Sequence, residues 1–332
     1  MRGVVFSQHG EPTEVARVSE LPGAPDPGAA DVRVGIIVAP LHRGDLVGIE
    51  AAPDGPFAPR PLGAEGAGVV EAVGESVGNL RVGQRVSVFP APGAWSQQVT
   101  VPAEAAVGVP ASVRDEVAAV TLVNAITSRD ALRAVEEVRV EADVSGDSPL
   151  VVSAAASAVG RLIVRQALDR GIPVIAAVRS DRSAATVAKF FPVVPVVVTA
   201  HDGWRDRLRG LVGPHGVPAI TDAYGGGFVR EVLPFLSDAG TLVVWGDLAA
   251  RPWTLSTGDL LMRELRVHAV SISRWMTRAA QARAADRQAA VRPAEQWPGL
   301  FAVYGEYPLD QLRSAVEAVR ANGSGTVLLR LN

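Results

Sequence analysis

The feature that most constrains this chain is the regular alternation of short apolar segments with amphipathic segments of helical length after about residue 120. Strands and helices that alternate at this spacing form right-handed crossovers, which build a parallel sheet with helices on both faces. The expected strands are residues 150–153, 173–178, 194–199, 219–223, 241–245 and 265–272. The expected helices between them are residues 158–170, 183–191, 204–211 and 227–236. This part of the chain is therefore predicted to form a doubly wound α/β domain.

The first 120 residues show a different pattern. Short valine-rich segments at 32–38, 68–73, 85–89 and 97–101 are separated by turn signals rich in glycine and proline. That pattern predicts a small, mostly antiparallel β unit. The C-terminal part is expected to contain a helix at 277–290, a helix at 309–321 and a closing strand at 325–331. The segment 279–292, rich in arginine and alanine, is expected to be a solvated helix, with a mobile lobe as the alternative.

Length and charge limit the class of protein. A chain of 332 residues fits two domains. The formal net charge of −3 argues against a general binder of nucleic acid, which needs a concentrated positive surface. The absence of cysteine excludes disulfides, thiolate nucleophiles, cysteine-ligated zinc and iron–sulfur clusters. No segment reaches the ~20 apolar residues that span a bilayer, and the N-terminus has only a short apolar run, so we expect a cytoplasmic location and no membrane partner.

The turn between the first predicted strand and helix is a candidate phosphate site. Strand ends and helix N-terminal N–H groups meet there, and the helix dipole favours an anion. Residues 153–160 read Ser-Ala-Ala-Ala-Ser-Ala-Val-Gly. Only Gly160 remains of a G-x-G-x-x-G fingerprint, but the small residues before it still allow a nucleotide to approach closely.

The end of the second predicted strand indicates which nucleotide. A site for NAD places an acidic residue there to bind the ribose hydroxyl, whereas this chain has Arg179, nineteen residues after Gly160. An arginine can donate to a 2′-phosphate in fork geometry, and a charged hydrogen bond of this kind contributes about 1.5–3 kcal/mol. The sequence therefore favours NADPH over NADH. The alternative is a surface arginine paired with Asp181.

Several motifs together resemble a known family. A β unit, a Rossmann unit and a return to the β unit occur with GAEGAGVVEAVGESV at 63–77 and RVGQRV at 81–86. This combination resembles the zinc-free branch of the medium-chain dehydrogenase/reductase superfamily. Within it the chain is similar to quinone oxidoreductases and, more closely, to mitochondrial-type trans-2-enoyl thioester reductases, on the residues at 93–95, 123–127, 157–160 and 272–275. The resemblance implies a GroES-like, mostly β catalytic domain (1–122 plus 274–332) and a Rossmann domain with a doubly wound parallel sheet (123–273).

The same resemblance implies NADPH as cofactor and assigns residues to it. Asn124 is expected near the nicotinamide ribose, with Thr127 as a further contact, and Tyr224 lies near the nicotinamide. The pyrophosphate is expected along Ala156, Ser157, Ala158, Val159 and Gly160. The 2′-phosphate is expected on Arg179, Ser180 and Arg182. The nicotinamide is expected to be framed by Trp245, Gly246 and Leu248 and by Ile272 and Ser273.

No metal is expected. The positions that hold zinc in zinc-dependent relatives correspond here to His42, Ala64 and Asn124. A single imidazole cannot hold zinc, which needs three protein ligands at a catalytic site. The neighbouring carboxylates Glu65 and Asp45 are therefore interpreted as structural hydrogen-bonding groups.

The chain departs from the enoyl reductases at their proton donor. Their tyrosine corresponds to Pro53 here, and no tyrosine occurs in the first 223 residues. A positioned general acid is worth about 10²–10⁴ in rate, so we consider two substitutes. His42 can titrate near neutrality, with a hydrogen-bonded loop histidine as the alternative. Tyr224 follows the fourth strand, with simple packing against the cofactor as the alternative. Trp95 matches a tryptophan near the family's substrate cleft, or is a core aromatic, and the family's C-terminal lysine falls at about Gly325.

These observations predict an NADPH-dependent oxidoreductase that transfers hydride, without metal, to an activated alkene or a quinone. The alkene is an α,β-unsaturated carbonyl or an enoyl thioester, and the cofactor is expected between the two domains. One alternative is a catalytically weak nucleotide-binding or structural member of the superfamily. Metal-free alcohol or ketone chemistry is less favoured, because an unactivated carbonyl usually needs a Lewis acid. The partners expected are a small-molecule acceptor and a second copy of the chain, paired through the edge strand at 265–270, and not nucleic acid or a membrane.

Overall fold

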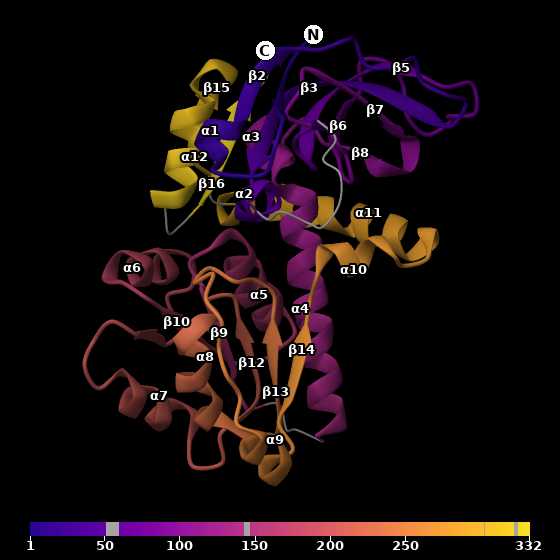
Figure 1. Cartoon of the computed structure of the whole chain (residues 1–332). Helices are drawn as coiled ribbons and strands as arrows, with labels where there is room; N and C mark the ends of the chain where they lie inside the picture. Colours follow the sequence, from indigo (N-terminus) through magenta and orange to yellow (C-terminus); the bar gives the residue numbers. More distant parts are fainter. Residues whose placement is uncertain (51–59, 143–146, 302, 322–324) are drawn as a thin grey trace. The chain divides into compact units, whose positions relative to one another are not determined.

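The computed structural model describes residues 1–50, 60–142, 147–301, 303–321 and 325–332. The chain divides into two compact units, one formed by residues 1–123 and 279–332 and the other by residues 124–278 (Figure 1). Pro53, the position aligned with the family's tyrosine, lies outside the described residues.

The unit of residues 124–278 is built on a six-stranded parallel sheet. The strands lie in the order β11-β10-β9-β12-β13-β14, and Figure 1 labels five of them, from β10 to β14, in this order from left to right. Their bounds are β9 Leu150–Ser153, β10 Val174–Val178, β11 Val196–Val198, β12 Val217–Asp222, β13 Leu236–Val244 and β14 Arg266–Ala269. Numbered along the chain this order is 3-2-1-4-5-6, the order of a dinucleotide-binding Rossmann sheet. The predicted doubly wound fold is confirmed.

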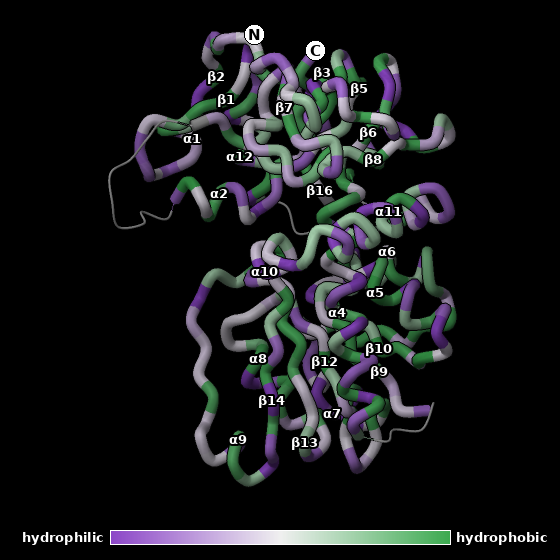
Figure 2. Tube along the Cα trace, turned by 90° about the vertical axis from the view of Figure 1, so that its right-hand side faces the viewer, coloured by the Kyte–Doolittle hydropathy of each residue, from purple (hydrophilic) through white to green (hydrophobic). Residues whose placement is uncertain are grey.

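A helix follows each of these strands. They are α5 Ala158–Asp169, α6 Asp181–Phe190, α7 Trp204–Val212, α8 Gly226–Val232, α9 Thr257–Arg263 and α10 Ile272–Met276. Apolar and polar residues alternate along α5 as green and purple bands in Figure 2. Every residue of β9, β10 and β12 is buried, as a sheet covered on both faces requires.

Several elements differ from the sequence-based expectation, and three of them bear on the site or the core. Helix α4 (Thr121–Glu141) was not predicted at all. The last expected strand, 265–272, ends at Ala269, and Ile272 begins helix α10 instead. The expected solvated helix 277–290 is α11 (Ala280–Gln296), which is longer and buries Asp286 and Arg287 to 2% and 1% exposure. The prediction of a solvated helix was wrong, because α11 packs against α3 (Asp115–Ala119) and β8 (Ala106–Gly108).

The unit of residues 1–123 and 279–332 is mostly antiparallel β structure, as predicted. A larger sheet runs β15-β16-β3-β5-β6-β8, with β7 also paired to β3, and a smaller sheet runs β2-β1-β4. The strands are β1 Arg2–Phe6, β2 Ala16–Glu20, β3 Asp31–Leu41, β4 Arg60–Pro61, β5 Gly66–Val73, β6 Arg85–Val88, β7 Gln98–Pro102, β15 Val303–Pro308 and β16 Thr326–Arg330. Helices α1 Pro12–Val15, α2 Arg43–Glu50 and α12 Leu312–Ala321 complete the unit.

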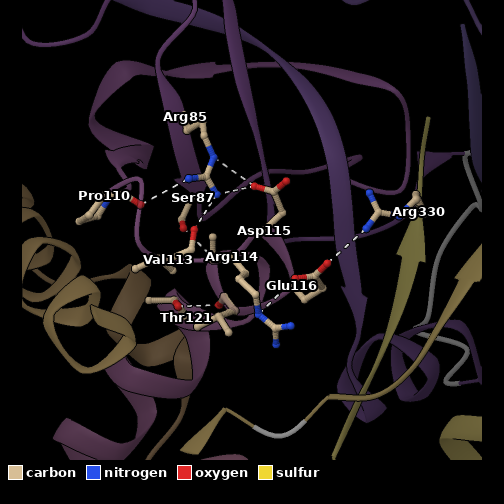
Figure 3. Close-up of polar contacts among 11 residues, drawn as sticks. Arg85, Ser87, Pro110, Val113, Arg114, Asp115, Glu116, Thr121 and Arg330 are labelled. Atoms are coloured by element: carbon tan, nitrogen blue, oxygen red, sulfur yellow. Dashed lines mark hydrogen bonds and ion pairs between the residues drawn. The ribbon is translucent and has the colours of Figure 1, made fainter. Parts of the chain in front are cut away.

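A polar network fastens α3 to the larger sheet (Figure 3). The Arg85 guanidinium donates to the Asp115 carboxylate at 2.5 Å and to the Val113 carbonyl at 2.7 Å. The Ser87 hydroxyl donates to the Ala118 carbonyl at 2.8 Å from within the core. Because α4 begins two residues after α3 ends, this network fixes the backbone where α4 starts.

The described part of the chain contains no helix that is both long enough and apolar enough to cross a membrane. The cytoplasmic location expected from the sequence stays a prediction.

Candidate functional site

The turn between β9 and α5 is compact and presents a helix N-terminus. The Ser157 hydroxyl accepts a hydrogen bond from the Gly160 N–H at 3.0 Å and so caps α5. A Cβ on Gly160 would lie 2.3 Å from the Ala154 carbonyl oxygen, so only glycine allows the helix to approach the turn this closely. Ala154 itself has a φ of 49°, in the left-handed region. The small residues and the dipole of α5 fit the pyrophosphate of a dinucleotide.

Arg179 lies directly after β10, at the same edge of the sheet as this turn. Its side chain is exposed, and its guanidinium carbon lies 4.9 Å from the ring centre of Tyr224. Asp181, the partner considered for a surface arginine, instead pairs with His201 at 3.0 Å. Ser180 caps α6 through the Ser183 N–H at 3.3 Å, and the exposed Arg182 occupies the first turn of that helix. The donors needed for a 2′-phosphate are therefore close together here.

A buried carboxylate ties the ends of β9 and β12 together. Asp222 is fully buried, and its Oδ1 accepts hydrogen bonds from the Ser153 hydroxyl at 2.5 Å and the Tyr224 N–H at 3.1 Å. Its Oδ2 accepts from the Gly225 N–H at 2.8 Å. Strands β9 and β12 are neighbours at the point where the strand order reverses, which is where ligands bind in open α/β sheets. Asp222 was not among the residues predicted for the site, although polar residues at the ends of two neighbouring strands are a signal for one.

Tyr224 lies at the centre of this edge. Its side chain is 7% exposed and packs edge-on against Phe228, with ring centres 5.2 Å apart. Burial, together with the Asp222 charge, raises the pKa of Tyr224 against the opposing effect of Arg179, so the hydroxyl stays protonated at neutral pH.

The other predicted cofactor residues lie on three further segments. Trp245, Gly246 and Leu248 follow β13, and the Leu248 N–H donates to the Ala223 carbonyl at 2.9 Å. Trp245 and Leu248 thereby pack against the cluster of Ala154, Ala223 and Tyr224. Ile272 and Ser273 form the first turn of α10. Asn124, which is buried, and Thr127 lie in the first two turns of α4.

The other unit contains a buried pair of titratable side chains. His42 follows β3, and its Nε2 lies 2.9 Å from Oε2 of Glu65, which is 1% exposed. The second carboxylate oxygen of Glu65 accepts from the Val123 N–H, in the first turn of α4, at 2.8 Å. The Asp45 carboxylate accepts from the His42 N–H at 2.8 Å. The position of the α4 N-terminus favours an ionised Glu65, which can then stabilise a charged His42.

Burial and charge act in opposite directions on this pair. Burial disfavours the charged ring, yet the hydrogen bond and charge of Glu65, with a smaller effect of Asp45, raise the pKa of His42 above its ordinary value of 6.5. Burial raises the pKa of Glu65, against the opposing effects of His42 and the backbone N–H groups. Glu65 therefore favours the protonated form of His42, while 22% of the His42 side chain stays exposed.

These side chains do not form a zinc site. Ala64 has no ligand atom, and the Nε2 of His42 is already bound to Glu65. Among the residues that the structure describes, no three or more histidine or acidic side chains come together as metal ligands. The donor set therefore does not fit zinc.

The two remaining family positions are also described. Trp95 is fully buried in the core, and its indole N–H donates to the Pro40 carbonyl at 2.8 Å. This burial fits a core aromatic, and a contact with substrate stays a prediction. Gly325 has a φ of 106°, which an L-residue such as the family's lysine rarely adopts.

Family comparisons agree with both units. The family model "Alcohol dehydrogenase GroES-like domain" matches residues 28–111, and the family model "Zinc-binding dehydrogenase" matches residues 158–287. The chain is 30% identical over 284 residues to the mitochondrial enoyl-[acyl-carrier-protein] reductase of Arabidopsis thaliana, covering 83% of this chain and 73% of that protein. It is 29% identical over 258 residues to the quinone oxidoreductase of Pseudomonas aeruginosa, covering 77% of each.

Solved structures show the same fold. A mycobacterial protein in complex with NADPH superimposes with a TM-score of 0.85 at 25% identity. The match covers 99% of this chain and 100% of that protein.

Replacing Glu65 tests the origin of the raised pKa of His42. Glu65→Gln should lower that pKa, because the charge that holds the proton is lost while burial remains. A raised pKa on folding means that the pair stabilises the protein below the unfolded value of 6.5 and that this contribution is lost as pH rises through the folded pKa. The variant should therefore lose more stability at about pH 6 than at about pH 9.

NMR titration of the His42 ring and urea unfolding at both pH values measure these effects. Asp45→Asn removes a weaker contribution and should lower the pKa less. An unchanged His42 pKa in Glu65→Gln would contradict the assignment.

Proposed function

This chain belongs to the medium-chain dehydrogenase/reductase superfamily, alongside its enoyl reductases and quinone oxidoreductases, and from this premise we propose that it is an NADPH-dependent reductase of activated alkenes or quinones that needs no metal. The observation that carries the proposal is Arg179, exposed at the end of β10 where an NADH site has an acidic residue. The mycobacterial relative of the same fold binds NADPH, which supports this choice of cofactor.

Residues of the Rossmann unit hold the cofactor in this proposal. The N–H groups at the start of α5, with Ala156, Ser157, Ala158, Val159 and Gly160, bind the pyrophosphate. Arg179, Ser180 and Arg182 bind the 2′-phosphate. Asn124, Thr127, Trp245, Gly246, Leu248, Ile272 and Ser273 surround the nicotinamide half. When bound, NADPH supplies the hydride that reduces the acceptor.

His42 is the proposed proton donor. Its Nε2 is bound to Glu65, so the proton that a charged ring can release is the one on Nδ1. Glu65 and the α4 N-terminus hold the ring in place and raise its pKa, which keeps the donor loaded near neutral pH. In reducing an alkene, His42 would deliver this proton to the α-carbon or the oxygen of the acceptor and then recover a proton from solvent.

The acceptor determines how much His42 matters. A reduced α,β-unsaturated carbonyl or enoyl thioester needs a proton at a defined atom, whereas a hydroquinone can take its protons from water. Pro53 stands where the family has its tyrosine. The dependence of turnover on His42 therefore distinguishes these two acceptor classes.

Arg179→Ala tests the cofactor assignment. The variant should raise the Kd for NADPH about ten- to a hundredfold, the equivalent of one charged hydrogen bond, and change the Kd for NADH much less. Arg179→Lys keeps the charge but not the planar fork of donors, so its Kd for NADPH should lie between those of wild type and Arg179→Ala. Isothermal titration calorimetry measures the six constants, for wild type and both variants with each coenzyme. Equal losses for NADPH and NADH would remove the 2′-phosphate role.

His42→Gln tests the proton donor. With an enone or an enoyl thioester, kcat should fall about 10²–10⁴-fold because glutamine cannot release a proton. With a quinone it should change by less than about tenfold, and the Kd for NADPH should be unchanged. Stopped-flow oxidation of NADPH against the three acceptors measures this. Unchanged kcat with the alkenes would make solvent the proton source, and wild-type protein that binds NADPH without oxidising it would favour the non-catalytic alternative.

We also propose that the chain forms a homodimer through the β14 edge. Leu261 and Met262 on α9 are 72% and 84% exposed. Val267 on β14 is 42% exposed, and every residue of β14 is exposed. Such an edge pairs readily with a second copy. Leu261→Asp with Met262→Asp should shift sedimentation from dimer to monomer. The matched control, Val193→Asp, lies before the opposite edge strand β11, is 83% exposed, and should leave the dimer intact. A dimer unaffected by the double substitution would place the interface elsewhere.

A further inference from the structure

The Arg179 side chain lies over an aromatic ring that another strand supplies. Its guanidinium carbon is 4.9 Å from the centre of the Tyr224 ring, which follows β12 rather than β10. A guanidinium stacked on a ring uses its face for the contact. The N–H donors of Arg179 lie in the guanidinium plane, so they stay available to the oxygens of a phosphate.

The Tyr224 ring cannot move easily. It is 7% exposed and packs edge-on against Phe228 with an interplanar angle of 87°. Its own N–H is bound to the buried carboxylate of Asp222, which also holds the next residue, Gly225. The backbone and the ring of Tyr224 are thus both fixed, and the fixed ring restricts where the guanidinium can lie.

The Tyr224 side chain also contacts a second segment. It packs in one cluster with Ala154 and Ala223. Ala154 is the first residue of the turn before α5 and has a left-handed φ of 49°. One side chain therefore joins the turn after β9 to the arginine after β10.

We propose that Tyr224 is a positioning residue that sets coenzyme preference, because its ring holds Arg179 ready for the 2′-phosphate. This inference rests on the proposed role of Arg179 in binding NADPH. An arginine that is already ordered loses less conformational freedom on binding, so it binds the phosphate more tightly than a mobile one.

The test measures the Kd for NADPH and NADH in Tyr224→Leu, Tyr224→Phe, Arg179→Ala and the double variant Arg179→Ala/Tyr224→Leu. Loss of the ring in Tyr224→Leu should weaken NADPH about tenfold and NADH less than about threefold. In the Arg179→Ala background the same change should have no further selective effect, because the ring acts through the arginine. Tyr224→Phe keeps the ring and should keep the ratio of the two constants within about threefold of wild type.

The matched control is Arg209→Ala, which removes a guanidinium that lies 4.9 Å from the Phe235 ring in the same unit and should leave both constants unchanged. Additive effects of Tyr224→Leu and Arg179→Ala, or equal losses of NADPH and NADH in Tyr224→Leu, would overturn the inference while leaving the NADPH assignment intact. A Tyr224→Phe variant that binds NADPH normally but loses kcat would overturn it in favour of a proton donor. If Arg179→Ala itself shows no selectivity, the proposed cofactor role fails first.

Discussion

The arrangement of residues at the carboxyl-terminal edge of the parallel sheet depends on one buried carboxylate. A fully buried Asp222 would be costly without partners, and the fold supplies them from the Ser153 hydroxyl and two backbone N–H groups. These bonds join the ends of β9 and β12 and fix the segment that carries Tyr224. Tyr224 then contacts both the phosphate turn and Arg179. The groups proposed to bind the cofactor follow three different strands, and these contacts fix their positions relative to one another.

The second unit solves a similar problem with Glu65. That carboxylate is also buried, and it is satisfied by the N-terminus of α4 on one oxygen and by His42 on the other. The network around Arg85 and Asp115 fixes α3 just before α4 begins (Figure 3). In both units, a buried acidic group holds the residue to which we assign a function, and the strand or helix ends provide the rigidity. Removing either acid would leave buried donors unpaired, which costs more than the bond itself contributes.

Much of the fold follows from local pattern. Strand β9 has its predicted bounds, and α5 ends within one residue of its predicted end, because buried parallel strands and amphipathic helices have clear periodicity. Helix α4 was missed because the polar residues of its first turns, Thr121, Asn124 and Ser128, are buried, so polarity along this segment does not follow exposure. Burial of Arg287 in α11 comes from packing against α3 and β8, which the sequence of the helix does not show.

In the candidate site, too, local features were predictable from the sequence and long-range contacts were not. Arg179 was predictable from its distance to Gly160, since the spacing of a βαβ unit is nearly constant. Its contact with Tyr224 was not, because the two residues are far apart in sequence and meet only through the strand order. The Glu65–His42 bond was only partly foreseen: Glu65 was given a structural role, and the raised pKa of His42 needed the geometry.

The most direct measurement of the central claim is a crystal structure of the protein with NADPH. The account predicts the 2′-phosphate within about 2.7–2.9 Å of the Arg179 guanidinium, with the Tyr224 ring still stacked behind it. A 2′-phosphate that points into solvent, with Arg179 turned away from the nucleotide, would contradict it.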